Sequence, residues 1–147
     1  MMTIEVKGLA EATQKFSAAP QRLVSELGKA MRQSVRDLHR QAVREAPVNK
    51  QSGGGNLRQM IGSSASGLKG SVVAKASYSA YVHEGTKPHI IVPRRARVLA
   101  NKRTGQFFGR KVNHPGTKAN PFLARALEKI TDKIAGHFNA ALKNILK

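Results

Sequence analysis

The sequence predicts an α+β fold: a mostly antiparallel sheet flanked by a long helix in the N-terminal half and a C-terminal helix, with a projecting basic β-hairpin. Apolar residues recur at three- and four-residue steps over residues 20–45 and again from 121 onward, which predicts the two helices. Alternating segments separated by turn residues lie between them and predict the sheet. With 147 residues, we expect a single domain, 1–147, containing the basic hairpin arm, 94–112.

The first elements are a short strand and the long helix. Thr3–Leu9 alternates as a strand. The helix is expected over Pro20–Glu45, because proline suits the first helical turn and Pro47 keeps the residue before it out of the helical region. Its apolar stripe comprises Leu23, Leu27, Met31, Val35, Leu38 and Ala42. The opposite face, which we interpret as solvated with a basic docking ridge as the alternative, carries Arg32, Arg36, Arg40 and Arg44.

The middle of the chain predicts a loop and then a strand. Residues 48–67 are rich in glycine and serine, which predicts a loop with a short ordered stretch near Leu57–Ile61. The three glycines at 53–55 lack the Lys-Ser/Thr pair of a phosphate-binding loop, so nucleotide binding is not expected. Lys69–Ala76 alternates as a strand.

The last segment carries the clearest helix signals. Asn120 suits the N-cap, and Pro121 suits the first helical position. We expect this helix to pack on the sheet or on a neighbouring subunit. Its stripe runs nearly to the last residue through Leu123, Leu127, Ile130, Ile134, Phe138, Leu142 and Ile145.

The stretch YSAYVHEGTKPHI, residues 78–90, concentrates residue types that occur in catalytic and metal sites. His83-Glu84 could open a helical zinc motif, but that motif needs a second histidine four residues after the first. His89 comes six residues later, past a glycine and a proline, so one helix cannot present both rings to one metal. No catalytic residue, cofactor or metal is therefore expected, and the protein is not expected to be an enzyme.

We interpret this stretch as a structural corner. Tyr78 and Tyr81 are expected as core side chains on a short helical turn, with Glu84 bonding to nearby amides. Gly85 then releases the chain into the next strand.

Charge is the strongest compositional feature, with 26 Lys+Arg against 8 Asp+Glu and a net charge of +18. No acid lies between Glu84 and Glu128. Within this interval, Arg97–Lys102 and Gln106–Val112 predict a hairpin that turns at Gly105. Its charges have no local acid to pair with, so we expect partner docking through Arg94, Arg95, Arg97, Lys102, Arg103, Arg110 and Lys111.

The composition also predicts where the protein is made. The chain has no cysteine, no apolar run of membrane-spanning length and no apolar signal core near its first residue. We expect synthesis in the host cytoplasm and no membrane contact.

Four short motifs occur in order along the chain: Ala46-Pro47, Gly55–Arg58, Tyr78–Thr86 and Pro121–Leu123 with Ala126-Leu127. Their order and spacing resemble the tail-component family of long-tailed bacteriophages. In that family a long helix ends in Ala-Pro, a Gly-x-Leu-Arg element and a Tyr-x-x-Val-Glu-x-Gly-Thr turn follow, and Pro-Phe-Leu-x-x-Ala-Leu opens the last helix. The resemblance covers about 43–129 in motif and the whole chain in element order. In this chain an inserted His83 separates the valine from the glutamate of the turn, and additional glycines precede the Gly-x-Leu-Arg element.

The resemblance implies a structural protein of the virion neck or tail top, similar to tail completion or head–tail joining proteins, which form rings and are not enzymes. The implied partners are adjacent neck proteins, tail-tube or tail terminator proteins, and further copies in a six-fold ring, with weak non-specific contact with packaged DNA.

The sequence supports two other functions less well. The charge alone supports a basic nucleic-acid-binding protein. Only Phe107 and Phe108 lie among the basic residues, however, and strand alternation puts them on opposite faces, which is unlike a stacking platform. A hydrolase of phage lysis or packaging has no supporting site.

Overall fold

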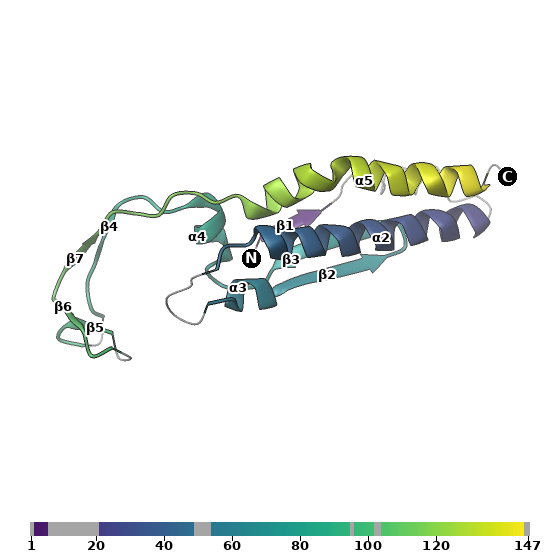
Figure 1. The fold of residues 1–147 in the computed structure, drawn as a ribbon. Helices are drawn as coiled ribbons and strands as arrows, with labels where there is room; N and C mark the ends of the chain where they lie inside the picture. Colours follow the sequence, from purple (N-terminus) through teal and green to yellow (C-terminus); the bar gives the residue numbers. More distant parts are fainter. Residues whose placement is uncertain (1, 6–20, 49–53, 95, 102–103, 146–147) are drawn as a thin grey trace. The chain divides into compact units, whose positions relative to one another are not determined.

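The computed structural model of the protein describes residues 2–5, 21–48, 54–94, 96–101 and 104–145 (Figure 1). The chain has the predicted α+β fold and forms two compact units, residues 1–80 with 121–147, and residues 81–120. The first unit contains β1 (Met2–Glu5), α2 (Gln21–Glu45), α3 (Asn56–Gln59), β2 (Ile61–Ser66), β3 (Lys69–Ala74) and α5 (Phe122–Ile145). The second contains β4 (His89–Ile91), β5 (Leu99–Ala100), β6 (Phe107–Gly109) and β7 (Val112–His114), and α4 (Ser79–Glu84) spans the boundary.

The sheet of the first unit is antiparallel, with strand order β1–β3–β2. The central strand β3 is the predicted strand that begins at Lys69. It pairs with β2 from Ala74 opposite Ile61 to Lys69 opposite Ser66, and with β1 on its other edge. Residues 6–9 of the predicted first strand lie outside the described residues.

Strand β2 was predicted as loop beyond its first residue, and that prediction was wrong. Its sequence, IGSSAS, contains one large apolar residue, Ile61, which is buried. Ser63, Ser64 and Ser66 are exposed, so the strand carries no apolar alternation. The hydrogen bonds to β3 define it as a strand, and pairing with a distant segment leaves no local signal.

Helix α2 is described from Gln21 and ends at Glu45 as predicted. Pro20, the predicted first residue, lies outside the described residues. Five of the six stripe residues are buried, and the sixth, Leu23, is half-buried. The four arginines of the opposite face are exposed. Beyond the helix end, Arg58 of α3 donates from Nε to the Ala46 carbonyl oxygen at 2.9 Å and from Nη2 to the Arg44 carbonyl oxygen at 3.3 Å. A side chain from another element therefore satisfies carbonyls that the helix leaves free.

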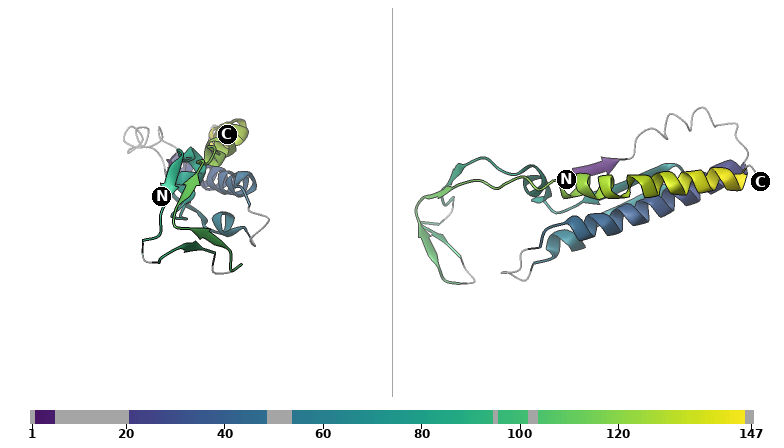
Figure 2. Two further views of the ribbon diagram at one scale, coloured as in Figure 1. Left: turned by 90° about the vertical axis from the view of Figure 1, so that its left-hand side faces the viewer. Right: turned by 45° about the horizontal axis from the view of Figure 1, so that its top comes forward.

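Helix α5 runs alongside α2, which also packs on β2 and β3 (Figures 1 and 2). Helix α5 begins at Phe122, one residue after the predicted start at Pro121, and the Arg125 N–H donates to the Pro121 carbonyl oxygen at 3.1 Å. The predicted stripe is less covered than expected: Leu123 and Ile130 are buried, and Leu142 is 44% exposed. The other stripe residues are half-buried: Leu127, Ile134, Phe138 and Ile145. The buried residues of α5 are Phe122, Leu123, Ala126, Ile130 and Ala141.

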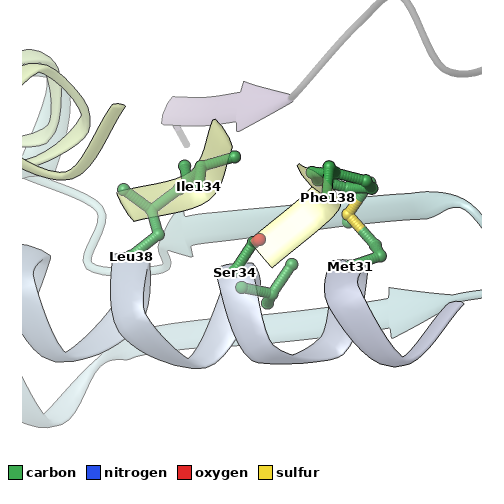
Figure 3. Close-up of a pocket in the computed structure, with 7 residues that line it drawn as sticks. Met31, Ser34, Leu38, Ile134 and Phe138 are labelled. Carbon is green, nitrogen blue, oxygen red and sulfur yellow. The ribbon is translucent and has the colours of Figure 1, made fainter. Parts of the chain in front are cut away.

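The core of the first unit lies where α2, α5 and β3 meet. A small apolar gap of about 10 Å³ remains there, and Figure 3 shows Met31 and Leu38 of α2 facing Ile134 and Phe138 of α5 around it. Gly70 of β3 completes the lining, so α2 approaches the sheet at a residue without a side chain.

Ion pairs also join α2 to α5. The buried carboxylate of Asp37 accepts hydrogen bonds from His137 Nε2 at 2.9 Å and from Lys133 Nζ at 3.0 Å. Burial alone would raise the pKa of Asp37, but the hydrogen bonds from His137 and Lys133 together with the charge attraction of these groups hold the pKa below the ordinary value of 3.8. Glu45 accepts from Lys129 Nζ at 2.6 Å, and this hydrogen bond lowers the pKa of Glu45 below 4.5.

Acid is therefore expected to destabilise the first unit. A carboxylate with a lowered pKa stabilises the fold above its unfolded pKa, and this contribution is lost as pH falls through the folded pKa. We expect the melting temperature, followed by the circular dichroism of the helices, to hold down to about pH 5 and to fall below about pH 4.

The variant Asp37→Asn separates this group from the other acids. It is expected to melt at a lower temperature than wild type at neutral pH, because the hydrogen bonds from His137 and Lys133 lose their charged acceptor. It should also lose less stability than wild type on acidification. An identical acid loss in both proteins would contradict the assignment to Asp37.

Candidate partner-binding arm

The second unit, residues 81–120, contains the expected docking residues and is the candidate functional site. Nine of its residues are lysine or arginine and one, Glu84, is acidic, which gives the unit a net charge of +8. Its start and end are held together by backbone pairing between Thr86 and Thr117, in which the two nitrogen-to-oxygen distances are 2.9 and 3.0 Å. The Asn120 N–H also donates to the Val82 carbonyl oxygen at 3.0 Å.

Two glycines allow this close approach. Gly85 has φ 76°, and a Cβ there would overlap the Thr117 carbonyl oxygen and lie 2.7 Å from the Ala119 nitrogen. Gly116 has φ 86°, and a Cβ there would overlap the Thr86 carbonyl oxygen. A side chain at either position would combine backbone strain with a clash against main chain, so both positions need glycine.

The structural corner contains a helical turn, α4, as predicted. The prediction that Tyr78 and Tyr81 are core side chains was wrong. Tyr78 is 39% exposed and Tyr81 is 64% exposed. The fully buried side chain is Ser79, whose hydroxyl donates to the Ala74 carbonyl oxygen at 3.0 Å. The buried contact at the start of α4 is therefore made by a small polar side chain and not by a tyrosine ring. Glu84 is exposed.

The predicted hairpin is present in a shorter form. Leu99 pairs with Gly109 and Ala100 pairs with Phe107, and the Gly105 N–H closes the turn on the Asn101 carbonyl oxygen at 2.8 Å. The expected pairing beyond Gly109 was wrong, because Val112 pairs with Ile91 of β4 instead. Continuing the hairpin in the Leu99–Gly109 register would place Arg97 directly opposite Lys111, and like charges opposite each other destabilise a ladder.

The β4–β7 ladder brings together two histidines that are far apart in the sequence. His89 lies opposite His114, and their rings stack with centroids 4.9 Å apart. His114 Nδ1 accepts a hydrogen bond from the Gly116 N–H at 3.1 Å. A neutral ring that accepts at Nδ1 carries its proton on Nε2, so the pair does not offer two free nitrogens to a metal. Within the described ranges, no three potential ligand side chains gather closely enough to hold a metal ion.

The described members of the expected docking set are Arg94, Arg97, Arg110 and Lys111. All four are exposed, and none forms a salt bridge with another described residue. Arg95, Lys102 and Arg103 lie outside the described residues.

The second unit also exposes large apolar side chains, which sequence reasoning missed. None of its described residues is buried. Ile90 is 57% exposed, Val92 is 56% exposed and Phe107 is 74% exposed. The signal in the sequence was the run HIIVP at residues 89–93, which lies in a segment without an apolar stripe to cover it.

Comparisons with protein-family models, curated proteins and solved structures gave no significant match. In the part of the chain that the structure describes, no helix is both long enough and apolar enough to cross a bilayer.

Proposed function

We propose that this protein is a structural subunit of a phage neck or tail top. In this proposal, it acts as a tail completion or head–tail connector protein, forms a six-fold ring and joins the DNA-filled head to the tail. It performs no catalysis, and the arginines and lysines of the second unit contact an adjacent neck, tail-tube or tail terminator protein.

One observation carries the proposal: the motif residues make structural contacts, whereas the basic residues of the docking set are exposed. The motifs that resemble the tail-component family lie at joints of the fold. Arg58 satisfies carbonyls at the end of α2, Gly85 permits the Thr86–Thr117 pairing, and Leu123 is fully buried. In contrast, the described basic residues of the docking set are exposed and have no acidic partner within the described chain. A subunit that functions through assembly needs both features, a self-contained body and an unmatched surface.

Charge reversal on the second unit tests the joining role. We expect Arg97→Glu with Arg110→Glu to leave the helical circular dichroism unchanged, because both side chains are exposed. Filled heads and finished tails should accumulate unjoined, and the yield of infectious particles should fall by about 100-fold or more, since complementary charge across an interface becomes repulsive.

Arg32→Glu with Arg36→Glu is the matched control, because it makes the same change in net charge on the exposed face of α2. This control is expected to keep near-normal particle yields. Normal yields from the second-unit variant, or an equal loss from both variants, would contradict the joining role of these charges.

The alternative function, nucleic-acid binding, makes a different prediction. A protein that neutralises about six to ten phosphates loses roughly a thousand- to a hundred-thousand-fold in DNA affinity between about 50 and 200 mM salt. We expect this protein to bind duplex DNA weakly, without sequence preference and with salt dependence of this kind. Tight, sequence-selective binding that persists at about 200 mM salt would favour the alternative.

A further inference from the structure

We propose that exposed apolar residues of the second unit form the contact surface for an acidic protein of a different sequence. The name apolar strip denotes four exposed apolar side chains of this unit, Ile90, Val92, Phe107 and Phe108, of which Phe107 and Phe108 project from opposite faces of β6. Phe108 also lines an open apolar hollow of about 290 Å³ together with Ile91, Leu99, Ala100 and Val112. The inference rests on the proposed function, because the joining role is what requires a partner protein.

The strip is not covered by the unit to which it belongs. Among its described residues, the backbone pairing outside the hairpin turn consists of one three-residue ladder, one two-residue ladder, one bridge and the Asn120–Val82 hydrogen bond. Isolated two-stranded ladders are marginally stable in water. Strand alternation places Ile91 on the face opposite Ile90, so β4 presents apolar side chains on both faces. Contact with another molecule would bury these side chains and stabilise the ladders.

The aliphatic members of the strip favour protein over nucleic acid. Ile90 and Val92 are aliphatic, and burying them against an apolar surface lowers the free energy of the complex. Phosphates offer no such surface, and bases stack on aromatic or guanidinium planes rather than on branched alkyl groups. The neighbouring Arg94 and Lys111 are exposed, so the apolar surface of the partner should be flanked by carboxylates.

The acid content of the chain argues against a second copy as the occupant. A second copy brings 26 basic residues and only 8 acids. Glu26, Asp37 and Glu45 already form ion pairs within the first unit. Among the described acidic side chains, Glu84, Glu128 and Asp132 remain outside the salt bridges, too few to match a unit with a net charge of +8. The occupant is therefore a different and acidic protein.

Photocross-linking tests the identity of the occupant. The full chain is produced with the photoreactive residue p-benzoylphenylalanine at Phe107, in the cells in which the protein is naturally made, and irradiated during assembly. A parallel protein carries the same residue at Leu142, an exposed apolar position of α5. We expect Phe107, and not Leu142, to cross-link to one different protein, through a peptide with more Asp and Glu than Lys and Arg.

A second substitution tests the strip itself. Ile90→Ser with Val92→Ser is expected to lower the cross-linking yield at Phe107 by at least about ten-fold. This is the loss of affinity expected when two aliphatic side chains are removed from a contact. Val24→Ser, at an exposed apolar position of α2, should leave the yield unchanged.

Cross-linking of Phe107 to nucleic acid, to a second copy or to a basic peptide would overturn the inference. A cross-linking yield at Phe107 no higher than at Leu142, or a yield undiminished by the two serine substitutions, would also overturn it. Cross-linking to an acidic partner that is not a virion protein would support the inference and contradict the joining role. Cross-linking to DNA, from a chain that is located in the neck, would contradict the inference and leave the joining role intact.

Discussion

Replacing Leu123 by aspartate is expected to unfold the first unit or to leave it as a molten species. Leu123 is fully buried near the start of α5, and aspartate would place a carboxylate in this buried position. An unpaired buried charge costs about 4 kcal/mol or more, a large part of the total stability of a domain. Loss of the cooperative thermal transition, followed by circular dichroism, measures the effect.

Leu142→Asp is the matched control, because it makes the same chemical change on the same helix at a side chain that is 44% exposed. The expected cost there is about 1 kcal/mol or less. If both variants melted at the wild-type temperature, or both unfolded, the assignment of the buried face of α5 would be wrong.

The second large effect is expected at Gly70, where α2 lies against β3. A Cβ on residue 70 would overlap Val35 Cγ2 and lie 2.8 Å from Met31 Sδ, and both of those side chains are buried. Gly70→Ala should therefore force α2 away from the sheet and lower the free energy of unfolding by about 1–3 kcal/mol, as overpacking does in other cores. Urea denaturation measures the change.

Gly136→Ala provides the control for this substitution. Gly136 lies in α5, and a Cβ there would meet no atom within 4 Å. Alanine should stabilise the protein by up to about 1 kcal/mol, because glycine has the lower helix propensity. Stabilisation by both alanines would contradict the close packing described around Gly70.

The helices were predictable because each carries its own signals. In α2, the run from Leu27 to Ala42 places its apolar residues on one face, and Pro47 ends the helix from within the local sequence. In α5, Asn120 and Pro121 predict the start to within one residue in the same local way. The side on which α5 is most buried was less predictable, since the position of α2 decides that Leu142 is exposed while Ala141 is buried.

The remaining features depend on contacts between distant segments. Strand β2 exists because Lys69–Ala74 lies beside it, and its serines show no apolar pattern. The hairpin is shortened because Val112 finds Ile91, which lies far earlier in the chain. The exposure of Phe107 could not be predicted either, because an apolar strand residue usually indicates a covered face.

The central claim is that this chain joins head to tail by docking its second unit on a neighbouring acidic protein. Reconstruction of the particle neck by electron cryo-microscopy tests this claim most directly. The expected result is a six-fold ring of this chain, with residues 81–120 of each copy ordered against a carboxylate-rich, partly apolar surface of a different neck or tail protein. Absence of the chain from the neck, or its presence as a single asymmetric copy, would contradict the account.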